Sequence, residues 1–208
     1  MNNLATCAAL LLLSFSARAQ LRVSPLAPAA VPATLQRSGR VVQALRYTDR
    51  TGTYTVLATE ISPRPDPAQH LQEDDQRADL YAYHYAAPGA APTWQVHDFV
   101  AECPLDLEAR FLPKALSVTD LDQDGTAEVW LAYRTTCRGD VSPSTQKIIM
   151  YEGPRKYAVR GTSRIAIGNG RYDGGTYTLD AAWQAAPAVF RQHAAQLWQQ
   201  HRNERLSD

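Results

Sequence analysis

Residues 115–133 read ALSVTDLDQDGTAEVWLAY, an acidic turn between two apolar segments. Carboxylates occupy the first, third, fifth and ninth positions of the turn, at Asp120, Asp122, Asp124 and Glu128. The flanking segments are short and rich in β-branched and aromatic residues, which is typical of strands. The stretch therefore predicts a β-hairpin whose loop closes around a cation.

Calcium is the cation that this loop fits best. Without an ion the four carboxylates would repel one another, and a hard dication bound by oxygen reverses the sign of that interaction. The main-chain carbonyl of Thr126 is a further candidate ligand, and Gly125 permits the sharp bend. The twelfth position, where an EF-hand needs glutamate, is Leu131, so the loop is not an EF-hand. The alternative is a solvated turn without metal.

The loop resembles the calcium loops of FG-GAP and integrin-type propeller blades, in which an acid at the ninth place leads directly into a strand. The resemblance implies an enclosed ion that stabilises the fold. It implies no catalytic role for the ion, because the loop oxygens leave few open positions.

The first 19 residues are typical of an export signal. Residues 8–13 are an apolar core, and Ala17–Arg18–Ala19 has the small-x-small pattern of a cleavage site. The apolar run is too short to span a bilayer. A buried N-terminal helix is the alternative, and the proline-rich stretch that follows argues against it.

Charge excludes several classes of partner. The chain has 21 Lys and Arg and 21 Asp and Glu, and cleavage after residue 19 removes Arg18, which leaves a balance near zero. Such a protein has no electrostatic reason to bind nucleic acid or an anionic membrane surface. No later segment is apolar enough to be an integral membrane segment.

Two cysteines, Cys103 and Cys137, remain after the signal. An oxidising compartment and an even count predict one disulfide between them. Two separate buried thiols are the alternative. With no histidine pair nearby, the two cysteines make a poor zinc site.

The chain after residue 19 predicts a mainly β, antiparallel fold, a sandwich or an open barrel-like sheet. Residues 20–38 form a Pro/Ala-rich leader that buries little and is expected to be extended and mobile. Residues 39–208 form one domain, with hairpins turning at residues 49–52 and 153–154. Residues 62–76 and 168–175 are expected to be loops.

The C-terminus predicts a helix over residues 187–203. Pro187 suits a helix start, and apolar residues then recur at three- and four-residue steps. This stripe comprises Phe190, Ala194, Leu197, Trp198 and His201. We expect the helix to cover one face of the sheet.

Three further groups of residues are candidates for function. Tyr81, Tyr83, Tyr85 and Trp94 would suit an aromatic platform for sugar rings, although half-buried cross-strand aromatics are the more common outcome. Glu73, Asp74, Asp75 and Asp79 would suit the acid and base of a glycosidase, or equally a solvated loop. Arg138–Gly139–Asp140 spells an adhesion tripeptide, for which pairing near the disulfide is the better explanation.

The central segment resembles a family of exported Bacteroidetes proteins that is named for surface polysaccharide biosynthesis. The resemblance rests on residues 118–129, on Cys137 to Pro143, on residues 147–153 and on residues 156–161. It implies a role in making or displaying surface polysaccharide, in the periplasm or outside the cell, with a glycan or an envelope assembly protein as partner. It carries over no catalytic residue.

The sequence thus favours a non-enzymatic, calcium-stabilised binding domain. A hydrolase or transferase acting on envelope glycans and a structural or adhesive surface protein are the alternatives. A cleft that holds the acids of residues 73–79, with one raised pKa, would favour the enzyme.

Overall fold

The structure is a computed structural model that describes residues 20–67 and 74–205. The predicted signal of residues 1–19 and the candidate acid Glu73 lie outside the described residues. The prediction of a mainly β, antiparallel fold is confirmed, and the sheets do not close into a barrel.

Five strands form an N-terminal sheet in the order β1-β2-β3-β4-β5, so each strand pairs with the next along the chain. All neighbours are antiparallel. The strands are β1 (Arg22–Pro25), β2 (Arg40–Thr48), β3 (Thr53–Pro65), β4 (Gln76–Tyr85) and β5 (Trp94–Cys103). The predicted turn at residues 49–52 joins β2 to β3.

The C-terminal sheet has the order β13-β10-β9-β8-β6, and β7 also pairs with β8. Its strands are β6 (Asp106–Phe111), β7 (Ser117–Thr119), β8 (Glu128–Arg138), β9 (Thr145–Glu152), β10 (Arg155–Thr162) and β13 (Tyr177–Leu179). Strands β11 (Arg164–Gly168) and β12 (Arg171–Gly174) form a separate hairpin. The helical elements are η1 (Pro28–Ala30), η2 (Ala181–Gln184) and α1 (Ala188–His201).

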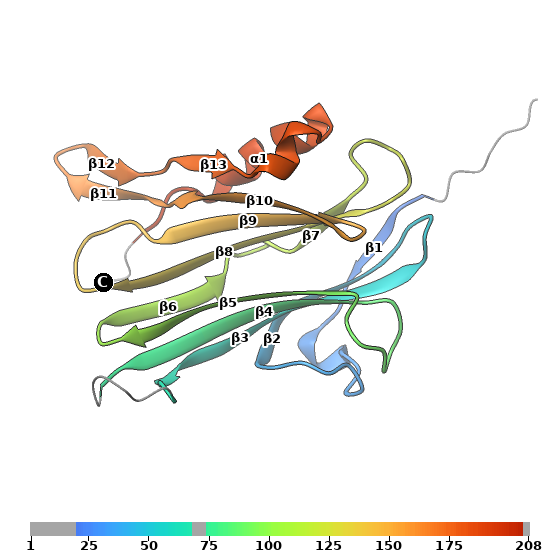
Figure 1. Cartoon of the computed structure of the whole chain (residues 1–208), viewed down its shortest axis with the longest axis horizontal. Helices are drawn as coiled ribbons and strands as arrows, with labels where there is room; N and C mark the ends of the chain where they lie inside the picture. Colours follow the sequence, from blue (N-terminus) through green and yellow to red (C-terminus); the bar gives the residue numbers. More distant parts are fainter. Residues whose placement is uncertain (1–19, 68–73, 206–208) are drawn as a thin grey trace, which may run out of the picture.

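The two sheets pack face to face, and alternation along β8 decides which residues meet. Val129, Leu131 and Tyr133 lie in the core between the sheets. Trp130 and Ala132 point to the opposite face, where they pack under α1 and η2. Strand β8 is therefore buried on both faces, which explains its continuous apolar run. Figure 1 shows α1 above the C-terminal sheet and the N-terminal sheet below it.

Helix α1 confirms the predicted C-terminal helix. Phe190, Ala194 and Trp198 of the predicted stripe are buried, whereas Leu197 and His201 are half-buried. Pro187 is the N-cap, one residue before the helix, where its missing N–H costs nothing. Within residues 20–67 and 74–205, no helix is both long and apolar enough to cross a membrane.

The leader of residues 20–38 packs on the N-terminal sheet, although most of its side chains are exposed; its mobility stays a prediction. Strand β1 pairs with β2, and Val31 and Leu35 are buried against Tyr83 and Tyr85. The outer face of the N-terminal sheet carries aromatic side chains, and covering them removes apolar surface from water. The leader thus forms a partial third layer on that face.

Two predicted loops also contain strand. Residues 62–65 continue β3, and a register shift between Ile61 and Arg64 accommodates the prolines there. Residues 171–174 form β12, so the glycines of the second predicted loop turn a hairpin instead.

The predicted disulfide is confirmed. Cys103, the last residue of β5, is bonded to Cys137 near the end of β8, with 5.8 Å between their Cα atoms. The bond closes a separation of 34 residues and ties the N-terminal sheet to the C-terminal sheet.

Candidate metal loop and adjoining cavity

The acidic loop connects β7 to β8, which pair antiparallel through Thr119 and Glu128. Carboxylate oxygens of Asp120, Asp122 and Asp124 lie within 4.8 Å of one another. The structure therefore brings together three of the predicted ligands. Oxygen ligands at this spacing fit a calcium ion, which accepts several carboxylates in flexible geometry.

The loop's own amides fix the direction of the three carboxylates. The N–H of Asp124 donates to Asp122 Oδ1 at 3.2 Å, and the N–H of Gly125 donates to Asp120 Oδ1 at 3.3 Å. The N–H of Thr126 donates to Asp124 Oδ1 at 2.6 Å. Gly125 has a φ of 86°, which glycine adopts without strain. These local bonds mean that the sequence alone determines most of the loop.

Glu128 lies outside the group of three carboxylates. Its buried side chain accepts hydrogen bonds from the N–H of Leu121 at 3.0 Å and from Thr119 Oγ1 at 2.5 Å. Burial raises the pKa of its carboxyl to about 7. Glu128 thus orders the start of the loop, and its direct contact with an ion stays a prediction, as does that of the Thr126 carbonyl.

Glu152 is an acidic neighbour that the sequence did not reveal. It pairs with Glu128 across β8 and β9, and burial, followed by the charges of Asp122 and Asp124, raises its pKa. No local sequence pattern indicates the position of Glu152, because the register between β8 and β9 brings it to the loop.

The acidic loop docks on the hairpin between β2 and β3. The N–H of Arg50 donates to the carbonyl of Gly125 at 3.0 Å, and the N–H of Ala127 donates to Asp49 Oδ2 at 2.9 Å. Asp49 Oδ1 in turn accepts the N–H groups of Thr51 and Gly52. The loop therefore joins the two sheets at this end of the sandwich.

A cavity of ≈ 230 Å³ lies beside the loop, between the same two sheets. It is lined by Tyr47, Asp49, Thr51, Tyr54, His84, Thr93, Trp94, Thr126, Ala127, Tyr151, Gly153 and Pro154. Four of its rings form a stacked row across β3, β4, β5 and β9. The centroids of Tyr54 and His84 are 4.8 Å apart, those of His84 and Trp94 5.0 Å, and those of Trp94 and Tyr151 4.2 Å.

His84 is held by hydrogen bonds at both ring nitrogens. Tyr47 Oη lies 2.8 Å from its Nε2, and Thr93 Oγ1 lies 2.5 Å from its Nδ1. One tautomer satisfies all groups: Tyr47 donates to Nε2, Nδ1–H donates to Thr93, and Thr93 donates to the carbonyl of His84 at 3.3 Å. Burial lowers the pKa of His84 to about 4, against a smaller opposing effect of Asp49, so the ring is neutral near pH 7.

We expect acid to destabilise the protein through His84. Between its ordinary pKa and the lowered one, the unfolded chain binds a proton that the folded protein excludes. Stability therefore falls as the pH drops from about 6.5 to about 4 and this loss ends below that range. The difference between the two pKa values corresponds to a loss of roughly 3 kcal/mol in the free energy of unfolding. Urea unfolding at a series of pH values measures the slope.

His84→Gln is expected to flatten that slope. Burial also lowers the pKa values of His193 and His201. These two residues contribute the same pH dependence of stability in the wild type and in the variant. Equal pH slopes for the wild type and the variant would contradict the prediction.

The predicted aromatic platform is not assembled. Tyr83 and Tyr85 are buried under the leader, where Tyr83 Oη accepts the N–H of Ser38 and Tyr85 Oη donates to the carbonyl of Gln36. Trp94 points into the core side of the sheet, away from these tyrosines, and packs against Tyr151. The three tyrosines do stack in a row on the outer face, with centroids 5.8 Å and 6.1 Å apart. Strand alternation separates Trp94 from them, and of the three tyrosines only Tyr81 stays half-buried beside the leader.

The acids of residues 74–79 do not form an acid–base pair. Asp79 is buried and binds Arg64 at 2.7 Å, Arg77 at 2.8 Å and His97 at 2.8 Å. Burial alone would raise the pKa of Asp79, but these hydrogen bonds outweigh it and hold the pKa well below its usual range. Asp74 is exposed at the end of the preceding connection. Asp79 is thus a fixed anion.

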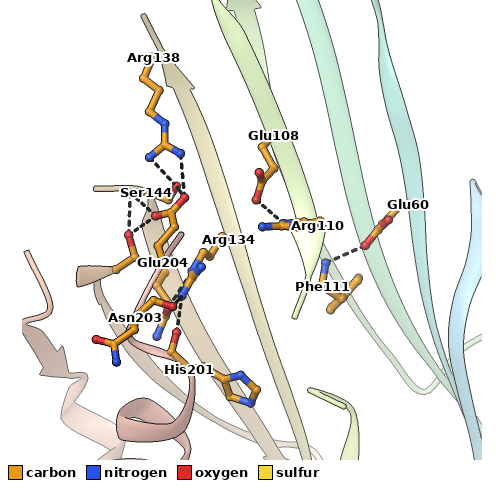
Figure 2. A network of polar contacts seen from close by, with 12 residues as sticks. Glu60, Glu108, Arg110, Phe111, Arg134, Arg138, Ser144, His201, Asn203 and Glu204 are labelled. Carbon is orange, nitrogen blue, oxygen red and sulfur yellow. Dashed lines mark hydrogen bonds and ion pairs between the residues drawn. The ribbon is translucent and has the colours of Figure 1, made fainter. Parts of the chain in front are cut away.

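The Arg138–Gly139–Asp140 segment has the structural role that the sequence favoured. Arg138, next to Cys137, binds Glu204 Oε1 at 2.8 Å and also donates to the carbonyl of Ser142. Figure 2 shows Arg138, Ser144 and Glu204 converging, with Arg134 on the carbonyls of His201 and Asn203 beside them. These contacts fix the segment after α1 to the end of β8.

Comparison of the chain with protein-family models, with curated proteins and with solved structures gave no significant match. No residue role is therefore transferred from another protein.

Proposed function

We propose that the protein is an exported β-sandwich that binds one calcium ion at residues 120–128 and acts as a non-enzymatic binding domain in the assembly of cell-surface polysaccharide. The observation that carries the proposal is the convergence of Asp120, Asp122 and Asp124 within 4.8 Å. The disulfide supports an oxidising compartment.

The chemistry of the donor set favours calcium over a transition metal. The three converging groups are all carboxylates, and hard oxygen ligands suit calcium, whereas zinc sites use cysteine and histidine. The nearby Glu152 adds to the negative field. A bound ion would offset this repulsion and strengthen the junction with the β2–β3 hairpin, which the loop already contacts through Gly125 and Ala127.

Three of the buried carboxylates have partners that favour binding over catalysis. Asp79 is held by two arginines and a histidine, Glu204 by an arginine and two serines, and Asp49 by main-chain amides. In residues 20–67 and 74–205, these three carboxylates serve as fixed anions within hydrogen-bond networks. A general acid or base must instead exchange its proton near the working pH. Glu128, whose pKa burial raises to about 7, meets that condition, but its side chain holds the start of the acidic loop through Thr119 and Leu121.

Calcium is expected to raise the melting temperature. At a free concentration of 100 times Kd, binding adds about 2.7 kcal/mol, which corresponds to roughly 5–10 °C for a domain of this size. Thermal unfolding with calcium and with a chelator measures the shift. The double variant Asp122→Asn, Asp124→Asn should lose it, whereas Asp140→Asn, an exposed acid outside the loop, should keep it. An unchanged wild-type melting temperature would overturn the calcium assignment.

Binding of polysaccharide is tested separately. Surface polysaccharide purified from the producing organism is titrated into the protein and followed by calorimetry. Saturable heat without any change in the chain length of the polysaccharide supports a binding domain. Shortening of the polysaccharide would show an enzyme, and absence of binding would overturn the glycan role.

A further inference from the structure

We infer that the cavity between the acidic loop and the aromatic row binds one neutral sugar ring of a glycan. The inference deepens the proposed glycan binding and rests on it. It assigns the binding site to Tyr47, Thr93, Trp94 and Tyr151, and not to the tyrosine strip on the outer face of the sheet.

The size of the cavity restricts the ligand to a single ring. Its volume of ≈ 230 Å³ is below the roughly 300–1,000 Å³ of pockets for drug-sized ligands. Both sheets contribute to it: Tyr47, His84 and Trp94 come from the N-terminal sheet, and Tyr151 comes from β9. A ring that enters the cavity would therefore contact both halves of the sandwich.

The aromatic row gives the cavity a rigid wall. His84 lies between Tyr54 and Trp94, following the strand order β3-β4-β5, and Trp94 also stacks on Tyr151 with an interplanar angle of 6°. Neighbouring rings in the row cover one another's faces, which holds each ring in place. A wall that is ordered before binding loses little entropy when the ligand arrives.

Hydroxyl groups give the cavity its polar character. Tyr47 and Thr93 use their protons toward His84 and its carbonyl in the tautomer described above, which leaves their oxygens as acceptors for the hydroxyls of a sugar. Thr51 and Tyr54 add a second hydroxyl pair, 3.0 Å apart. Apolar ring carbons beside several hydroxyls match a pyranose, which has C–H groups and hydroxyls on one small ring.

The charges select a neutral ligand. Both oxygens of Asp49 accept main-chain amides, and His84 carries no charge near pH 7. Of the described residues, those that line the cavity include no lysine or arginine. A phosphate or uronate would meet the Asp49 carboxylate inside the cavity, whereas the adjoining cations, Arg50 next to Thr126 and Lys156 next to Tyr151, are not among the lining residues. This arrangement disfavours an anion.

The test uses tryptophan fluorescence of the full exported chain. Trp94 lines the cavity, whereas Trp130, Trp183 and Trp198 lie on the opposite face of the C-terminal sheet, so a ligand in the cavity changes chiefly the Trp94 emission. Glucose, galactose, mannose, rhamnose and N-acetylglucosamine are the neutral probes. Glucuronate and glucose 6-phosphate are the anionic ones. We expect saturable changes with at least one neutral sugar and none with the anions.

Thr51→Trp is the blocking variant, because Thr51 is an exposed residue at the rim and a larger side chain there fills the cavity without altering the core. Because the substitution introduces a tryptophan whose emission would add to that of Trp94, binding to this variant is measured by calorimetry. We expect its affinity for the neutral sugar to fall at least about tenfold. Tyr172→Ala, an exposed aromatic on β12, is the control and should bind as the wild type does.

The outcomes separate this inference from the proposed function. Polysaccharide that binds the wild type and Thr51→Trp equally would overturn the cavity site and leave the glycan role standing. Tighter binding of an anionic sugar would overturn the neutral class. A wild type that binds no surface polysaccharide and no monosaccharide would overturn both, whereas failure of the calcium shift alone would leave the cavity site intact.

Discussion

Trp130→Ala is expected to lower the free energy of unfolding by about 3–5 kcal/mol. Trp130 is fully buried between β8 and α1, where its ring lies 4.7 Å from that of His193. Its Nε1–H donates to Thr119 Oγ1 at 2.8 Å, and the same hydroxyl binds Glu128. The substitution thus opens a cavity and also removes a hydrogen bond that holds β7 at the start of the acidic loop.

Urea unfolding of the variant measures this loss. Tyr172→Ala removes a ring that is more than half exposed and that stacks on the guanidinium of Arg164. It should change stability by no more than about 1 kcal/mol. If Trp130→Ala unfolds at the wild-type midpoint with an unchanged slope, the packing of α1 on the C-terminal sheet is wrong. We also expect the variant to bind calcium more weakly, because Thr119 then has more freedom.

Glu204→Gln is expected to cost about 3–5 kcal/mol, because it leaves the partly buried charge of Arg138 without its partner. Glu204 also accepts hydrogen bonds from Ser144 Oγ at 2.8 Å and from Ser163 Oγ. Burial alone would raise the pKa of Glu204, but these hydrogen bonds and Arg138 lower it to about 2. Figure 2 shows the Glu204 carboxylate beside Arg138 and Ser144, which joins the segment after α1 to the end of β8.

The pH dependence gives this prediction a second readout. The folded protein keeps Glu204 ionised at pH values where the unfolded chain protonates it, so its contribution is complete above about pH 4.5 and is lost as the pH falls toward 2. Glu204→Gln should abolish that part of the acid transition. Glu108→Gln, in the more exposed pair with Arg110, is the control and should change stability by less than about 1 kcal/mol. An equal loss of unfolding free energy in Glu204→Gln and Glu108→Gln would contradict the stabilising role of the buried pair between Glu204 and Arg138.

Local features of the fold were predictable from the sequence. Asp120, Asp122 and Asp124 converge because the bonds that turn the loop join residues two to five positions apart. The stripe of Phe190, Ala194 and Trp198 follows directly from helical geometry. The partner of Cys103 followed from the count of two cysteines that remain after the predicted signal of residues 1–19.

The packing of the leader and of the aromatic residues could not be predicted from the sequence. The proline-rich composition of residues 20–38 indicates a chain that buries little by itself, yet Val31 and Leu35 are buried because β4 presents Tyr83 and Tyr85 beneath them. A segment's own composition does not reveal the surface on which it will lie. For the same reason, the sequence did not predict that Glu152 lies beside the acidic loop, nor that four rings from four strands form the stacked row.

The sequence by itself determined the acidic hairpin, the disulfide pair and the amphipathic helix, because each depends on spacing within a short segment or on a count. Only the tertiary structure decided that Trp94 and Tyr151 meet beside Thr126. That meeting depends on the register within each sheet and on how two sheets stack, and both are set by long-range burial of apolar faces. The acidic loop is therefore local in origin, whereas the cavity beside it is a property of the whole sandwich.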